Sequence, residues 1–115
     1  MKLVRQPPGS NLCGQACVAM VLGRTLDDVR PLFRKWGLTR TKDLVQALKN
    51  GSCYPKAERL IRVHRGRLMP PVAICKFGWP GLWKSHWVVW ADFKFWDPEV
   101  DGTCGARMTA YLRVE

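Results

Sequence analysis

Two kinds of segment are missing from the sequence, and each absence narrows what the protein can be. No run approaches the roughly 20 uninterrupted apolar residues that a helix needs to cross a bilayer. The opening residues, MKLVRQPPG, lack the apolar stretch typical of a secretion signal. We therefore expect a cytoplasmic protein with no membrane attachment.

Metal-binding spacing is missing as well. A structural zinc site needs two tight Cys pairs, or one pair with His at ligand spacing. Here Cys13 and Cys17 lie one helical turn apart, no second tight pair exists, and His64 and His86 are the only His residues. Five Cys in a chain without an export signal predict reduced thiols instead of a disulfide framework. We expect neither a metal nor another cofactor.

Acidic residues are scarce: nine Asp and Glu accompany 19 Lys and Arg, for a formal charge of +10. Up to Arg67 there are 14 basic and four acidic residues, and from Leu68 onward there are five of each. This excess in the first half attracts acidic partners such as nucleic acid, or else forms a solvated face. The densest basic segment, residues 56–67, has no aromatic side chain that could stack on bases, which weakens the case for nucleic acid.

The chain length and composition predict one folded domain over residues 1–115. The 47% hydrophobic content and six Trp exclude intrinsic disorder. Helical patterns come first and strand patterns follow, which predicts an α+β fold with N-terminal helices on a mostly antiparallel sheet. The helices are expected at 13–23, from Thr25 until Gly37 stops the second, and from Thr41 with Gly51 after the end of the third; the strands are expected at 59–64, 72–77, 86–92, 93–97 and 108–114.

The helix ends carry their own signals. The first helix is apolar nearly all round, which predicts a buried helix with Ser10 or Asn11 near its N-cap and Gly23 closing it. Thr25 and Asp28 have the spacing of a capping box at the start of the second helix. Thr41 is expected to begin the third.

Cys13 stands where a Pro-rich extended segment turns into the buried helix. A thiol at a helix N-terminus meets the positive end of the helix dipole and unpaired amides, which favour the reactive thiolate. The alternative is an ordinary small buried side chain, as most intracellular Cys are.

His86 opens one expected strand and Asp97 closes the next. If residues 91–94 contain the turn of a hairpin, Asp97 returns to within a residue or two of His86. A carboxylate there could orient an imidazole that serves Cys13 as base and acid. Alternatively, His86 is a half-buried edge residue and Asp97 opens a turn before Pro98.

Two further features could complete a site. The side-chain amide of Gln6 and the backbone N–H of Cys13 could stabilise an oxyanion, although Gln6 could equally be an exposed terminal residue. Trp79 and Trp83, around a Pro-Gly turn, could wall a peptide-binding cleft or pack in the core. The acidic residues from Asp92 to Asp101 lack calcium-loop spacing and indicate turns.

These residues, in the order Gln6, Cys13-Gly14, His86-Trp87-Val88-Val89 and Asp97-Pro98, resemble the papain-like cysteine peptidases of the bacteriocin-processing, double-glycine-leader group. The resemblance spans nearly the whole chain. It implies that Cys13 is the nucleophile, His86 the general base and acid, Asp97 the orienting carboxylate and Gln6 the oxyanion donor. Six residues separate Gln6 from Cys13, whereas family members usually have five.

The resemblance implies a stand-alone hydrolase that cleaves a peptide or isopeptide bond through a thioester and needs no cofactor. Deamidation and acyl transfer use the same Cys-His pair and stay open. Substrates of acidic character would suit the basic first half. The alternatives are an inactive papain-like module that binds a protein, and a basic nucleic-acid-binding domain.

Overall fold

Helices come first and strands follow along the chain, as the sequence predicts. The computed structural model describes residues 1–66 and 68–115. The helical elements are α1 (Cys13–Leu22), the 3₁₀ helix η1 (Asp27–Leu32) and α2 (Thr41–Asn50), and the strands are β1 (Ile61–Arg62), β2 (Val72–Gly78), β3 (Ser85–Ala91), β4 (Lys94–Trp96) and β5 (Arg107–Arg113). The α+β fold class is therefore confirmed.

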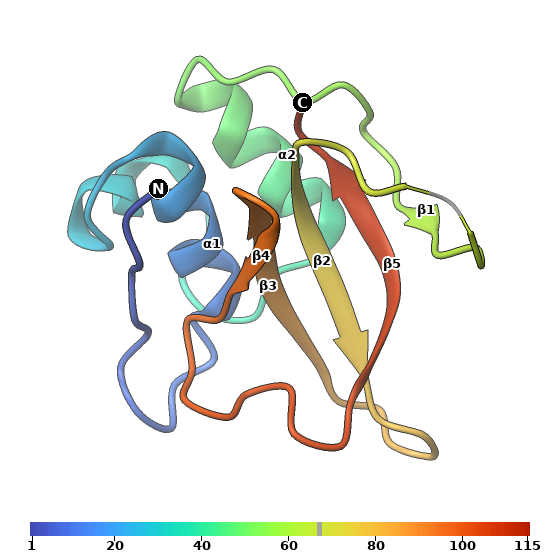
Figure 1. The fold of residues 1–115 in the computed structure, drawn as a ribbon. Coiled ribbons are helices and arrows are strands. Elements are labelled where there is room, and N and C mark those ends of the chain that lie inside the picture. The colour runs from blue at the N-terminus through green and yellow to red at the C-terminus, as the bar shows by residue number, and fades with distance from the viewer. Residues whose placement is uncertain (67) are drawn as a thin grey trace.

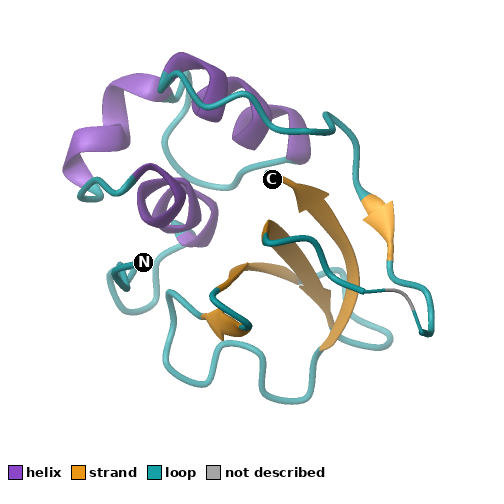
Figure 2. Cartoon of the chain, turned by 45° about the horizontal axis from the view of Figure 1, so that its top comes forward, coloured by secondary structure: helices purple, strands orange, loops and turns teal. Residues whose placement is uncertain are grey.

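The strands form one five-stranded sheet in the order β1-β5-β2-β3-β4, and every neighbouring pair is antiparallel. The helical elements gather on one side of this curved sheet (Figures 1 and 2). Helix α1 packs mainly against β3, so the first helix reaches the strand that carries His86. Within the described residues, no helix has the length and apolar character needed to cross a membrane.

Helix α1 is the most deeply buried element. Its residues from Gly14 to Met20 are all buried, and Gly23 ends it in the left-handed conformation at φ 67°. A residue with positive φ at this position is typical of helix C-termini, and Gly adopts it without strain. The N-cap prediction was wrong: the helix begins after Leu12, and no side chain caps it. Its first amides are therefore left for other partners.

The second predicted helix is shorter than expected and of another type. The capping box is confirmed, because the Asp28 N–H donates to Thr25 Oγ1 at 3.2 Å and the Thr25 N–H donates to Asp28 Oδ2 at 3.4 Å. The element is a 3₁₀ helix that ends at Leu32 instead of continuing to Gly37. Pro31 lies inside it and has no N–H to donate, so a longer α-helix is disfavoured.

Helix α2 begins at Thr41, as predicted, and is amphipathic. Leu44, Val45 and Leu48 are buried on its inner face. They join side chains of α1 and the sheet in the larger of two core clusters. The smaller cluster lies on the other face of the sheet, around Phe77, Val88 and Tyr111.

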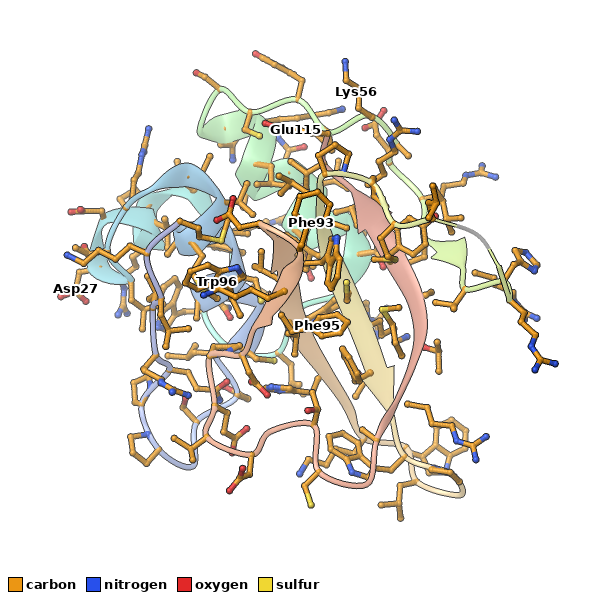
Figure 3. All side chains as sticks on the ribbon, viewed as in Figure 1. Asp27, Lys56, Phe93, Phe95, Trp96 and Glu115 are labelled. Carbon is orange, nitrogen blue, oxygen red and sulfur yellow. The ribbon has the colours of Figure 1, made fainter. Side chains whose placement is uncertain are left out.

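The β3–β4 hairpin turns through Asp92 and Phe93. Both residues have positive φ, at 54° and 59°, as a two-residue type I′ turn requires. The turn therefore lies within residues 91–94, as predicted. Figure 3 shows Phe95 over the front of the sheet, where it packs edge-on against Phe77 and Trp90, and Trp96 on the side toward α1.

Strand β1 is much shorter than the predicted strand 59–64. Only Ile61 and Arg62 pair with β5. The segment is an edge of the sheet, and its charged residues stay exposed, so little burial favours a longer pairing. Arg67, the last member of the basic segment, lies outside the described residues.

We predict that Leu44→Ala destabilises the fold through the cavity that it leaves. Leu44 is fully buried in the larger cluster, so the free energy of unfolding should fall by about 2–5 kcal/mol. Leu38→Ala removes the same atoms from a side chain that is 80% exposed. It should change the free energy of unfolding by less than about 0.5 kcal/mol. Urea unfolding of both variants measures the difference; equal effects would contradict this description of the core.

Candidate active site

Cys13 is the first residue of α1 and is half-buried. Its neighbour Gly14 brings the helix close to the segment before α2: a Cβ at Gly14 would lie 2.0 Å from Thr39 Oγ1 and 3.0 Å from Leu44 Cδ2. No larger residue fits there without a shift of these neighbours. This close approach at Gly14 holds the start of the helix, and Cys13 with it, in place.

The hairpin brings Asp97 to His86. Val89 pairs with Trp96, so continuing the register by one residue sets Asp97 opposite Val88, two positions along β3 from His86. Residues two apart on a strand share a face, and such diagonal neighbours lie within reach of long side chains. His86 Nε2 lies 2.7 Å from Asp97 Oδ1. The predicted meeting of these residues is confirmed.

Backbone contacts hold Asp97 in its position. The Glu99 N–H donates to Asp97 Oδ1 at 2.9 Å, and the Arg5 guanidinium donates to the Asp97 carbonyl oxygen at 3.2 Å. The Gln6 N–H donates to the Pro98 carbonyl oxygen at 2.9 Å. The N-terminal segment therefore ties the loop after β4 to the chain that leads into α1, and so connects the surroundings of Asp97 and Cys13.

His86 is buried between a carboxylate and a thiol. Burial lowers the pKa of its imidazole, but hydrogen bonds to the side chains of Asp97 and Cys13, and the negative charges of both groups, outweigh burial and raise the pKa to about 9. Because Nε2 faces Asp97, the other ring nitrogen, Nδ1, is left for Cys13. At neutral pH the imidazole is thus held in its protonated form, with Asp97 as the acceptor at Nε2.

Glu99 is a second carboxylate near the imidazole. Its Oε2 lies 3.9 Å from His86 Nδ1, on the nitrogen that Asp97 leaves free. The side chain is 42% exposed, so solvent weakens its interaction with the ring. The sequence analysis assigned Glu99 only to a turn; its closeness to Asp97 in the sequence was the one signal of a role near His86.

Gly102 covers the His86–Asp97 pair. A Cβ at this position would lie 2.6 Å from His86 Nε2 and 2.9 Å from Asp97 Oδ1. The sequence analysis missed this residue because nothing in an Asp-Gly dipeptide indicates what it packs against. The turns expected among the acidic residues are present, since the Gly102 N–H donates to the Glu99 carbonyl and the Cys104 N–H to the Asp101 carbonyl.

Gln6 is buried instead of exposed, and its side chain is engaged locally. Its Nε2 donates to the Ser10 carbonyl oxygen at 2.8 Å, and its Oε1 is buried without a partner among the described residues. The exposed-terminus alternative is therefore wrong. The same Nε2 also lies 3.5 Å from Ser10 Oγ, so both hydrogen-bond contacts of the Gln6 amide nitrogen are to Ser10.

The other thiols are poorer candidates. Burial, and then nearby thiols and Asp97, raise the pKa of Cys17 far above its ordinary range, as expected for a side chain inside the helix. Burial raises the pKa of Cys75 to about 12. Burial also raises the pKa of Cys53. His64 is exposed, and it lies far from Cys13 and Asp97 in the sequence.

The aromatic loop between β2 and β3 is not core. Trp83 is fully exposed, which contradicts the core-packing alternative for this residue. Trp79 is half-buried, and its Nε1 donates to the Cys104 carbonyl oxygen at 2.7 Å. This bond joins the loop before His86 to the loop that follows Asp97.

Comparisons with known proteins add no relative: the chain matches no protein-family model, and no significant match was found among curated proteins or among solved structures.

We predict that Asp97→Asn lowers the pKa of His86 from about 9, because the carboxylate charge and its acceptor are removed while burial stays. A raised His pKa stabilises the folded state fully below the unfolded value near 6.5, and this stabilisation is lost as pH rises through about 9. Wild-type stability should therefore fall over that interval, and the fall should shrink in Asp97→Asn.

NMR titration of the imidazole and urea unfolding across this pH range measure both effects. Asp92→Asn is the matched control, since Asp92 lies in the same hairpin and contacts the N-terminal amine instead of His86. If the pKa of His86 is the same in wild type and Asp97→Asn, the assigned cause is wrong.

We also predict that Gly102→Ala disturbs the pair by steric contact. The added methyl group overlaps His86 Nε2, which should cost about 1–3 kcal/mol of stability and shift the imidazole resonances. Gly78→Ala is the control, because a Cβ there has its nearest contact at 3.8 Å, an ordinary distance. Unfolding measurements with NMR of the imidazole test this; an unchanged His86 spectrum in Gly102→Ala argues against the packing.

Proposed function

We propose that the protein is a small papain-like cysteine hydrolase that cleaves a peptide or isopeptide bond with Cys13, His86 and Asp97. The observation that carries the proposal is the buried imidazole of His86, which is bonded to Asp97 through Nε2 and whose pKa Asp97 and Cys13 together raise to about 9. A nucleophile in contact with a base that a third group orients is the general signature of nucleophilic catalysis.

The first step forms a thioester. The Cys13 thiolate attacks the carbonyl carbon of the substrate, an S–C bond forms, and the carbonyl oxygen becomes an oxyanion. The His86 imidazolium donates its Nδ1 proton to the nitrogen of the leaving amine as the C–N bond breaks. Asp97 holds the ring orientation through Nε2 and stabilises its positive charge.

The second step releases the acid. The neutral imidazole of His86 takes a proton from water, and the resulting hydroxide attacks the thioester carbonyl. The C–S bond breaks, a carboxylic acid leaves, and Cys13 returns as a thiolate beside protonated His86. Acyl transfer to an amine and deamidation follow the same two steps with another acceptor or another amide, so they belong to the same proposal.

The oxyanion needs hydrogen-bond donors at the start of α1. The first amides of a helix have no partner within it, and here the first bond of α1 runs from the Ala16 N–H to the Leu12 carbonyl. The Cys13 N–H is therefore one donor in the proposed site. The Gln6 side-chain amide, once it turns from Ser10 to the substrate, is the second donor, supported by its burial and by the attachment of its backbone to the loop that follows Asp97.

The proposal predicts selective reactivity of Cys13. Near pH 6, iodoacetamide should modify Cys13 roughly tenfold faster or more than Cys104, because the helix start and the imidazolium stabilise the attacking thiolate. Cys104 is the internal reference, since it is an exposed thiol. Intact-mass and peptide-mass analysis of timed samples gives the rate at each thiol.

His86→Ala should reduce the rate at Cys13 to that of Cys104, and Cys13→Ala should abolish the fast modification. An inactive protein-binding module would instead show slow modification of every accessible thiol in wild type as well. Equal rates at Cys13 and Cys104 would therefore rule out an activated nucleophile.

A further inference from the structure

A shallow hollow of about 410 Å³ adjoins the end of β3 that begins with Ser85 and His86. Its volume is within the range of roughly 300–1,000 Å³ that small-ligand pockets occupy. It is formed by the end of β2, the β2–β3 loop and the beginning of β5, and its lining includes Lys76, Trp79, Trp83, Lys84, Ser85 and Arg107.

The charges in this lining all have one sign. Lys76, Lys84 and Arg107 are present, and no Asp or Glu lines the hollow. The second half of the chain is balanced overall, with five basic and five acidic residues after position 67, so this gathering is local. A concave surface lined only by positive charges concentrates the electrostatic field and favours a ligand that carries carboxylates.

The aromatic wall is partly fixed and partly free. Trp79 is held by its bond to the Cys104 carbonyl, and the Lys84 ammonium lies 4.9 Å from the centre of its ring. The loop is rigid at its tip, because Pro80 precedes Gly81 at φ 75° and the Leu82 N–H donates to the Trp79 carbonyl, as in a type II turn. Trp83 is fully exposed, so its whole indole surface is open to a ligand.

We propose that this basic, tryptophan-lined hollow binds an acidic segment of the peptide substrate, with carboxylates on Lys76, Lys84 and Arg107 and apolar parts against Trp83. This assignment rests on the proposed function, which it narrows to substrates with Asp or Glu near the cleaved bond. Ser85 lines the hollow and His86 follows it in β3, so the hollow lies at the same end of this strand as the imidazole.

Single-stranded nucleic acid is the competing ligand, because cations and exposed aromatic rings also bind bases and phosphates. Such binding sites extend along several nucleotides in a basic groove. Here the cations gather in one hollow at the end of β3 instead of along a groove, which favours a short acidic segment.

The test measures binding to the full chain with Cys13→Ala, which keeps the hollow and removes the nucleophile. Fluorescence anisotropy compares a labelled peptide containing Asp and Glu with the same peptide carrying Asn and Gln, and with a labelled oligothymidylate. We expect the acidic peptide to bind roughly tenfold more tightly than its amide counterpart, with an affinity that falls as salt is added.

Two variants should remove this preference. Trp83→Ala should weaken acidic-peptide binding roughly tenfold, as expected of an exposed aromatic anchor, and Lys84→Glu with Arg107→Glu should abolish the preference for carboxylates. The charge-matched control is Arg62→Glu with Arg65→Glu, which changes the net charge equally at exposed residues outside the hollow. Phe93→Ala, at a side chain 94% exposed elsewhere, is the aromatic control.

Equal losses in the control pair would show that the overall charge is responsible and would overturn the proposal. Tighter binding of the oligothymidylate than of the acidic peptide, lost in the hollow variants, would assign the site to nucleic acid and also overturn it. Failure of the proposed hydrolase appears separately, in the alkylation rate of Cys13 in the otherwise unaltered chain.

Discussion

The contact between His86 Nε2 and Asp97 Oδ1 is the interaction on which the candidate site depends. It is made by one strand and the loop that follows the next, so it exists only when the β3–β4 hairpin has its observed register. A carboxylate bonded to an imidazole holds one ring nitrogen and directs the other toward Cys13. Without this contact, burial would be opposed mainly by Cys13, and the pKa of the imidazole would be lower than about 9.

Three loops far apart in the sequence close around this pair. The N-terminal segment bonds to residues 97 and 98, Gly102 lies against the imidazole and the carboxylate, and Trp79 joins the β2–β3 loop to Cys104. The acceptors are backbone carbonyls, and two of the donors are the side chains of Arg5 and Trp79, so these contacts depend both on the chain path and on those side chains. These contacts explain how a small α+β fold holds the buried His86 against Asp97.

Local sequence patterns predicted most of the fold, because the apolar residues of each helix and strand recur with the period of that element. The all-apolar pattern of α1, the single inner face of α2 and the type I′ turn at Asp92 and Phe93 are properties of short stretches of chain. The wrong predictions of element length also have local causes. Pro31 limits η1 to a 3₁₀ helix. The exposed basic edge limits β1 to two residues, Ile61 and Arg62, that pair with β5.

The sequence by itself determined that Cys13 begins a buried helix and that Asp97 returns toward His86, because helix starts and hairpin register are encoded within a few residues. Only the tertiary structure decided that the thiol meets the imidazole, that Gln6 is buried with its amide on Ser10, and that Trp83 faces solvent. These outcomes depend on how α1 packs on β3 and how the loops cross. Such packing arises from contacts between residues far apart in the chain, which periodicity and spacing do not record.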